Sequence, residues 1–287
     1  MRPLRALAAR CLAAARIAQR TEDASRFGMY KECALHARWL VDAATAKHAD
    51  PVQAQNAVRG MVERVARHEP LAYVLGTQPF GPLELCVRAP VLIPRPETED
   101  WTLALAERLR SAGPLRILDL CTGSGCIAIL LAHTLRTTDL LAVDLDPACV
   151  ALAAENARRC QVRIATRRVD LFDDAAMLSL GAFDLVVCNP PYIPSCDYTS
   201  LHQSVRAFES RSALVGSHAE NDGLLYYRRL VELLPRGLLR PSASPFQLVV
   251  EVGAGQADAV QKLFAPIGGC AQWQDPWGHQ RVVALRS

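Results

Sequence analysis

The sequence predicts an α/β protein, with a doubly wound, mostly parallel sheet that follows a small N-terminal helical domain. From residue 115 onward, nearly continuous apolar strands alternate with helices, which is typical of a sheet covered on both faces. Residues 30–68 have the apolar spacing of helices instead. A chain of 287 residues that is 51% hydrophobic can hold one medium domain and a smaller companion.

Residues 1–70 form the expected helical domain. Leu35, Trp39 and Ala43 recur every four residues, and a second helix follows the Asp50-Pro51 start. Its apolar face comprises Ala54, Val58, Met61 and Val65. Residues 1–20 contain five arginines and no acid, which fits a mitochondrial transit peptide and also fits the first helix of a folded domain.

Residues 71–92 change to a period of two after a Gly- and Pro-containing turn, with Leu83, Leu85 and Val87 alternating. This pattern predicts a β-hairpin linker. Residues 93–287 then form the expected α/β domain, whose strands include "LRILDL", "LLAVDL", "FDLVVCN", "FQLVVEVG" and "QRVVALR". Ligands of such folds bind beyond the carboxyl ends of the strands.

Charge and cysteine usage exclude several classes of protein. Residues beyond 20 sum to −2, although the whole chain carries +3, so the body lacks the basic surface of a polyanion-binding protein. The ten cysteines are scattered without a C-x-x-C pair or a His cluster, so we expect no metal site and a reducing compartment. No segment approaches the ~20 uninterrupted apolar residues of a membrane span.

"LDLCTGSGCIAI", residues 118–129, joins a strand to a helix through Gly123 and Gly125. Glycines allow the backbone to approach a ligand closely, and the helix that follows offers unpaired N–H groups. Asp119 would repel a pyrophosphate and suits an ammonium or hydroxyl donor. The alternative is a tight strand-to-helix turn without a ligand.

Two acids follow the next strands. Asp144 lies about twenty residues after the glycines, where a carboxylate can bind both ribose hydroxyls of an adenosine. Asp146 precedes Pro147 and suits the N-cap of the following helix, which leaves Asp144 for a ligand. Asp170 has the equivalent place after the third strand and could bind an adenine amino group, or simply belong to a surface loop.

"LDLCTGSG", "AVDLDP", "VDLF" and "NPPY", in that order, resemble the motifs of class I S-adenosylmethionine-dependent methyltransferases. The resemblance implies a seven-stranded sheet whose last strand is antiparallel. It also implies S-adenosyl-L-methionine as the cofactor, with S-adenosyl-L-homocysteine as the product, across the ends of the first four strands.

"NPPY", residues 189–192, ends a buried strand. The two prolines stop the sheet ladder and stiffen the backbone. Asn189 could accept one N–H of a planar NH₂ group, and the Pro190 carbonyl, stiffened by Pro191, could accept the other. Tyr192 could form a flat wall beside that group. Motifs of this kind occur in methyltransferases that act on adenine or cytosine amino groups and in those that act on glutamine.

"IPRPETE", which contains Arg95 and Glu97, precedes "NPPY" by about ninety residues. Alone it predicts only a well-started helix. Together with "PLAYVLGTQPFG", "AAENA" and "DPWGHQRVV", it resembles the HemK/PrmC protein-(glutamine-N5) methyltransferases, especially their fungal mitochondrial branch. That family methylates the glutamine of the Gly-Gly-Gln motif in class 1 peptide-chain release factors.

The family resemblance implies a role for each matching residue. Asn189, Pro190 and Tyr192 would be catalytic, and Asn189, Pro190, Pro191, Tyr192, Arg95 and Glu97 would bind the glutamine. The cofactor would contact Asp119, Cys121, Thr122, Gly123, Ser124, Gly125, Asp144, Asp170, Leu171 and Asn189.

Two residues depart from the family pattern. Cys121 stands where relatives usually carry glycine, and Leu171 stands where bacterial relatives often carry tryptophan. We therefore expect a compensated or weaker cofactor site. A nucleic-acid amino-methyltransferase and a non-catalytic scaffold are the alternatives. We expect a monomer that binds neither nucleic acid nor membranes, in mitochondria or alternatively in the cytoplasm.

Overall fold

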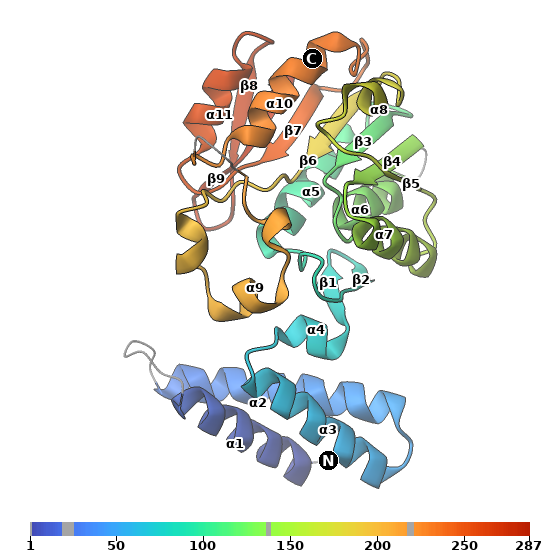
Figure 1. Cartoon of the computed structure of the whole chain (residues 1–287). Coiled ribbons are helices and arrows are strands. Elements are labelled where there is room, and N and C mark those ends of the chain that lie inside the picture. Colours follow the sequence, from blue (N-terminus) through green and yellow to red (C-terminus); the bar gives the residue numbers. More distant parts are fainter. Residues whose placement is uncertain (1, 19–25, 136–138, 217–220) are drawn as a thin grey trace. The chain divides into compact units, whose positions relative to one another are not determined.

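The chain folds into two compact units in the computed structural model, which describes residues 2–18, 26–135, 139–216 and 221–287 (Figure 1). The first unit comprises residues 1–77 together with 202–208, a stretch that includes α9 (Gln203–Phe208). The second comprises residues 78–201 and 209–287. Within the described residues, no helix is long and apolar enough to span a membrane.

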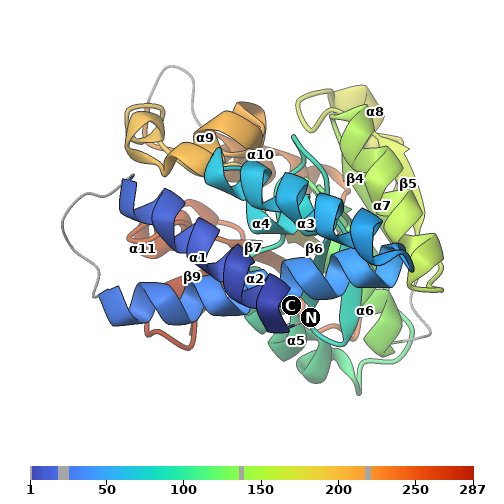
Figure 2. The ribbon, with the colours of Figure 1, turned by 90° about the horizontal axis from the view of Figure 1, so that it is seen from below.

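Besides α9, the first unit contains three long helices and one short one among its described residues: α1 (Arg2–Ala18), α2 (Arg26–Lys47), α3 (Pro51–Ala66) and α4 (Leu71–Leu75). Figure 2 shows α1, α2 and α3 packed against one another. Asp50 caps α3 by accepting from the Val52 N–H, and Pro51 occupies its first position. These signals are those that predicted the start of this helix.

Small and branched side chains form the core of this unit, including Ala8, Leu12, Ala37, Leu40 and Val58. The α1 helix therefore contributes to a packed core within the unit. The expected face of α2 is different from its buried face: Leu35 is 45% exposed and Trp39 is 43% exposed. The four-residue spacing predicted the helix correctly, but the side chains that pack inward lie on its other side.

The second unit begins with the hairpin β1 (Thr77–Phe80) and β2 (Leu83–Cys86) and the helix α5 (Pro96–Leu109). Arg95 is extended immediately before α5, as its position ahead of a proline requires, and Glu97 and Glu99 lie in the first turn. Trp101, Leu105 and Leu109 recur every four residues and form a buried stripe along this helix.

A seven-stranded sheet with the order β5-β4-β3-β6-β7-β9-β8 forms the centre of this unit. Its strands are β3 (Arg116–Leu120), β4 (Asp139–Asp144), β5 (Ala165–Arg168), β6 (Leu185–Cys188), β7 (Phe246–Glu251), β8 (Cys270–Gln274) and β9 (Gln280–Arg286). The last strand pairs antiparallel with both β7 and β8. The doubly wound fold class and its antiparallel last strand are thus confirmed.

Helices cover both faces of the sheet (Figure 1). One core contains residues of α5, α6 (Cys126–Leu135) and α7 (Pro147–Arg159), and the other contains residues of α8 (Asp174–Leu178), α10 (Leu225–Leu233) and α11 (Ala257–Phe264). The strand order reverses between β3 and β6. A topological switch point of this kind is where open α/β sheets bind ligands.

Candidate active site

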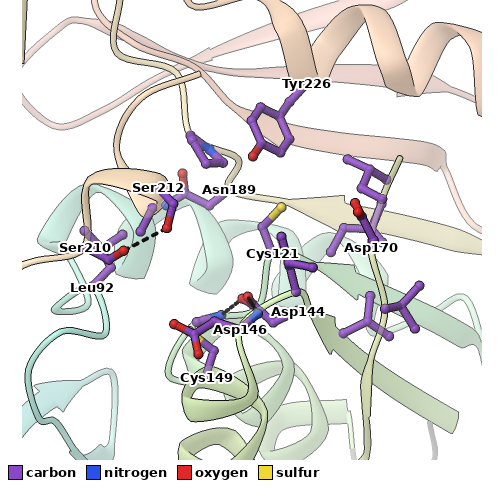
Figure 3. A pocket seen from close by; sticks show the side chains of 18 of the residues that line it. Leu92, Cys121, Asp144, Asp146, Cys149, Asp170, Asn189, Ser210, Ser212 and Tyr226 are labelled. Carbon is purple, nitrogen blue, oxygen red and sulfur yellow. Dashed lines mark hydrogen bonds between the residues drawn. The ribbon is translucent and has the colours of Figure 1, made fainter. Parts of the chain in front are cut away.

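A pocket lies at the carboxyl ends of β3, β4, β5 and β6, and four separate turns line it (Figure 3). The turns after these strands supply Cys121 and Gly123, Asp144 to Asp146, Val169 to Phe172, and Asn189 with Pro191. Tyr226 and the segments 91–92 and 210–213, with Ser212 among them, complete the wall. The structure therefore brings the candidate residues of four motifs, which are far apart in the sequence, into one hollow.

The glycine-bearing turn depends on backbone conformations that side chains disfavour. Gly123 and Gly125 have φ values of 56° and 83°, and Cys121 has φ 57°. A Cβ atom on Gly125 would lie 2.9 Å from the Cβ of Ala153 in α7, so this glycine permits close helix packing. Cys121 holds a left-handed conformation that costs a non-glycine residue about 1 kcal/mol and that glycine would adopt without this cost.

Asp119 lies beneath this turn instead of lining the pocket, and its side chain is fully buried. Its Oδ2 accepts from the Thr122 hydroxyl at 2.6 Å and from the Ala128 N–H at 3.3 Å. Burial raises the pKa of this carboxyl to about 7. Asp119 therefore organises the turn through Oδ2, and its contact with a ligand remains a prediction.

Three further residues of the turn also support it from below. Thr122 and Ser124 are buried, and the Ser124 carbonyl accepts from the Asn156 amide at 2.9 Å. Together with Gly125 they are absent from the pocket wall, whereas Cys121 and Gly123 belong to it. Cys121 and Gly123 are thus the residues of this turn that lie at the pocket, and cofactor contacts of Thr122, Ser124 and Gly125 remain a prediction.

Asp144 ends β4 and points into the pocket (Figure 3). Its Oδ2 accepts from the Gly123 N–H at 2.9 Å and its Oδ1 accepts from the Asp146 N–H at 3.0 Å. Each oxygen keeps a lone pair for one hydroxyl group. Burial raises the pKa of Asp144. Asp146 caps α7 through the Ala148 N–H, as the sequence predicted.

Asp170 and its two successors form the wall beyond β5. Asp170 lines the pocket, and its Oδ1 accepts from the Phe172 N–H at 2.9 Å. Leu171 also lines the pocket, but it is only 7% exposed and belongs to the core. Phe172 is 44% exposed in the same wall and packs edge-on against Tyr226. Leu171 was expected to deprive the pocket of an aromatic side chain, but Phe172, the next residue, supplies one.

The "NPPY" segment divides between the pocket and the interior. Asn189 and Pro191 line the pocket, and Pro190 is buried. The Tyr192 hydroxyl donates to Glu251 Oε1 at 3.3 Å, and burial raises the pKa of the phenol. Tyr192 was expected to form a wall of the glutamine pocket; the structure places its hydroxyl in a buried contact with a carboxyl group.

Two glycines hold the backbone of this segment in place. A Cβ on Gly216 would lie 2.0 Å from the Pro191 carbonyl oxygen, and one on Gly223 would lie 2.0 Å from that of Tyr192. The Ile193 N–H donates to Leu214 at 2.9 Å. The segment is therefore clamped by main-chain contacts in addition to the stiffness of its prolines.

Arg95 and Glu97 do not line the pocket. One Arg95 nitrogen is 2.7 Å from both carboxylate oxygens of Glu209, whose side chain is buried. This pair ties the start of α5 to the segment 209–213, which supplies part of the pocket wall. Arg95 thus positions the wall. Burial raises the pKa of the Glu251 carboxyl, and the negative charge of Glu97 raises it further.

The sequence analysis missed Thr98, Glu209, Glu251 and Phe172. Glu251 at the end of the apolar run "FQLVVE" carried a usable signal, because a carboxyl group inside a buried strand needs partners. No local sequence pattern indicated a role for Thr98 or Glu209. Among the described residues, no group of three or more His, Cys, Asp or Glu side chains could hold a metal ion.

The pocket fits S-adenosylmethionine. Asp144 offers two acceptor oxygens for ribose hydroxyls, and Leu145, Val169 and Phe172 offer an apolar slot for a planar base. The turn with left-handed backbone at Cys121 and Gly123 also lines this pocket. Fold and pocket together define a class I S-adenosylmethionine-dependent methyltransferase.

Comparisons with known proteins specify the family. Residues 97–208 match the family model described as "Methyltransferase small domain". The chain is 43% identical to the release factor glutamine methyltransferase of Geobacter sulfurreducens over 80% of its length and 78% of the relative. It is 35% identical to the "Probable MRF1 mitochondrial N(5)-glutamine methyltransferase mtq1" of Schizosaccharomyces pombe, over 77% and 76% of the two chains.

The chain belongs to the release factor glutamine methyltransferase family, which confirms the resemblance seen in its motifs. Among solved structures, the catalytic domain of hMettl16 in complex with a MAT2A 3'UTR hairpin superposes with a TM-score of 0.54 at 18% identity, covering 75% of this chain and 79% of that one. A similarity of this kind supports the fold alone.

Proposed function

We propose that the protein transfers a methyl group from S-adenosylmethionine to the side-chain amide nitrogen of the glutamine in the Gly-Gly-Gln motif of a class 1 peptide-chain release factor. Its relatives are named for this activity. The observation that carries the proposal is that Asn189 and Pro191 line the same pocket as Cys121, Gly123 and Asp144. The groups suited to an acceptor amide therefore adjoin those suited to the cofactor.

The cofactor supplies an electrophilic sulfonium methyl group when it is bound. The residues of the chain orient the acceptor, because an amide nitrogen has a delocalised lone pair and reacts only when it is held at near-attack geometry. Asn189 Oδ1 accepts one N–H of the glutamine amide, and the Pro190 carbonyl accepts the other. The close approach of Gly216 to the Pro191 carbonyl and of Gly223 to the Tyr192 carbonyl restricts the main chain that follows these two acceptors.

Mass spectrometry of a release factor incubated with the protein and S-adenosylmethionine tests this function. We expect a mass increase of one methyl group on the Gly-Gly-Gln glutamine. The variant Asn189→Ala should lose far more turnover than cofactor affinity. An unmodified glutamine with the intact protein, under saturating cofactor, would refute the proposal. The alternative of a nucleic-acid amino-methyltransferase is not favoured, since the relatives are named for glutamine.

We infer that the N-terminal helical unit docks the release factor. Leu35 and Trp39, one turn apart on α2, form an exposed apolar strip within this unit. Exposed apolar patches of this kind commonly mark protein contacts. The double variant Leu35→Ser/Trp39→Ser should raise the KM for the release factor and leave kcat unchanged. An unchanged KM would refute this docking face.

We also propose mitochondrial localisation and a monomeric state. The arginine-rich residues 1–20 and the Schizosaccharomyces pombe relative support the first, while the bacterial relatives support the cytoplasmic alternative. Ala8, Leu12 and Ala13 are buried in the helical unit, so cleavage after residue 20 would remove part of its core. N-terminal sequencing of the mature protein shows whether residues 1–20 are retained. Recovery of an uncleaved start outside mitochondria would contradict the mitochondrial proposal.

A further inference from the structure

A buried chain of hydrogen bonds leads from a carboxyl group to Asn189. Glu251, at the end of β7, is 1% exposed. Its Oε2 accepts from the Thr98 hydroxyl at 2.6 Å and from the Trp101 indole N–H at 2.8 Å. The Asn189 Nδ2 group in turn donates to Thr98 Oγ1 at 3.2 Å.

The sheet and α5 explain why these side chains meet. Cys188 pairs with Val250 in the parallel register of β6 and β7, so Asn189 and Glu251 follow directly at the same edge of the sheet. Thr98 and Trp101 are three residues apart on α5 and therefore lie on one face of that helix. All of these groups belong to the second unit.

The chemistry of each group fixes the direction of this chain. An ionised carboxylate only accepts hydrogen bonds, so the single hydroxyl proton of Thr98 must go to Glu251. The Thr98 oxygen can then still accept a hydrogen bond, but it has no proton left to donate in another. Of the two ends of the Asn189 amide, only the NH₂ end can satisfy Thr98, which leaves Oδ1 free on the other side.

We propose that Glu251 and Thr98 are positioning residues that set the orientation of the Asn189 amide. With Nδ2 held by Thr98, Oδ1 faces the pocket and selects an acceptor that presents an N–H group, such as a carboxamide, over one that presents only oxygen. This inference rests on the proposed glutamine methylation and supplies a reason for its choice of a nitrogen acceptor.

A second contact strengthens the role of the same carboxyl. Its Oε1 accepts from the Tyr192 hydroxyl at 3.3 Å, and the Glu251 main-chain carbonyl accepts from the Tyr227 hydroxyl at 2.8 Å. Glu251 therefore contacts both ends of the "NPPY" segment: Asn189 indirectly, through Thr98, and Tyr192 directly. Loss of its charge would loosen the segment at two points.

Protonation of Glu251 would remove the preference for one orientation of the Asn189 amide. A protonated carboxyl could donate to Thr98, which would free the hydroxyl proton for Asn189 Oδ1 and allow the amide to turn over. Burial raises the pKa of Glu251, and Glu97 raises it further, while Thr98, Trp101 and Arg281 lower it. Burial raises the pKa of the neighbouring Tyr192, and the charges of Glu251, Arg281 and Arg95 also act on it, the two arginines lowering it. Activity should therefore have an acidic limb that depends on Glu251.

Thr98→Val, Thr98→Ser and Glu251→Gln, each in the full chain, test the inference. Thr98→Val should lower kcat about 10- to 100-fold, the range expected for hydrogen bonds to charged groups, with cofactor affinity in calorimetry changed less than about threefold. Thr98→Ser, which keeps the hydroxyl, should retain most of the activity. Glu251→Gln should lower kcat and abolish the acidic limb of its pH profile.

Thr102→Val is the matched control. Thr102 is buried one turn further along α5, and its hydroxyl donates to the Thr98 carbonyl at 2.6 Å, outside the chain that reaches Asn189. This variant should match the wild-type kcat to within about threefold. Equal losses of kcat in Thr98→Val and Thr102→Val, or an unchanged acidic limb in Glu251→Gln, would overturn the inference.

A readout without turnover separates this inference from the proposed function. In the side-chain ¹⁵N spectrum, one Asn189 amide proton should exchange slowly with water in the wild type and rapidly in Thr98→Val. Fast exchange in the wild type refutes the orientation even if the release factor is methylated. Slow exchange lost in Thr98→Val supports the orientation even if the substrate proves to be different.

Discussion

The buried carboxyl of Asp119 makes the stability of the catalytic unit depend on pH in a direction that can be measured. Burial raises its pKa from 3.8 to about 7, so the folded state binds a proton more tightly than the unfolded state. The stabilising contribution is complete below pH 3.8 and is lost as the pH rises through 7. Each pH unit between 5 and 7 costs about 1.4 kcal/mol, which amounts to about 3 kcal/mol between pH 5 and pH 8.

Asp119→Asn removes this ionisation and retains an acceptor for Thr122 and Ala128. Urea unfolding at pH 5, 6, 7 and 8, followed by tryptophan fluorescence, reports mainly on the second unit, which contains Trp101, Trp273 and Trp277. The free energy of unfolding of the variant, relative to wild type, should rise by about 3 kcal/mol from pH 5 to pH 8.

Asp184→Asn is the control for this measurement. Asp184 is a second buried carboxyl, immediately before β6, and its hydrogen bond to Arg240 holds its pKa below the ordinary value. It stays ionised throughout this range, so its substitution should shift the free energy of unfolding equally at pH 5 and at pH 8. If the difference between wild type and Asp119→Asn were also constant from pH 5 to pH 8, the reasoning about burial would be refuted.

Three further substitutions test the pocket and its support. Asp144→Asn should raise the Kd for S-adenosylmethionine about 10- to 100-fold in calorimetry, because hydrogen bonds to a charged acceptor contribute about 1.5–3 kcal/mol; an unchanged Kd would exclude the ribose contact. Phe172→Ala should raise the same Kd about fivefold by removing an aromatic face worth about 1 kcal/mol, and an equal Kd would show that the ring does not face the base. Gly216→Ala should lower kcat more than cofactor affinity, since its Cβ would meet the Pro191 carbonyl at 2.0 Å, whereas Gly269→Ala, with nothing within 4 Å of its Cβ, should behave as wild type.

Much of the fold could be predicted because its signals are local. The alternation of apolar strands and helices depends on side chains a few residues apart, and the start of α7 followed from Asp146 and Pro147 alone. The buried face of α2 was harder to predict, since Leu35 and Trp39 are apolar yet exposed. Hydrophobic spacing identifies a helix, but small residues such as Ala37 can form the side that packs.

The candidate site could be predicted where a residue reaches it from the end of a strand. Asp144, Asp170 and Asn189 all line the pocket, because the carboxyl ends of parallel strands meet at one edge. Glu209 and Thr98 were beyond sequence reasoning, since their roles depend on contacts across 114 and 91 residues of chain. Such pairings follow from packing and leave no local spacing to read.

The proline pair that ends β6 accounts for only part of the rigidity of the acceptor site. Prolines restrict φ at two residues, but they fix neither the depth of the segment nor the orientation of the Asn189 amide. The glycine clamp excludes movement of the carbonyls towards Gly216 and Gly223, and the bonds from Glu251 through Thr98 select one of two nearly isosteric amide orientations. A methyl transfer to a weakly nucleophilic nitrogen requires both position and orientation, so the motif can function only with support from α5, β7 and the segment around Gly216.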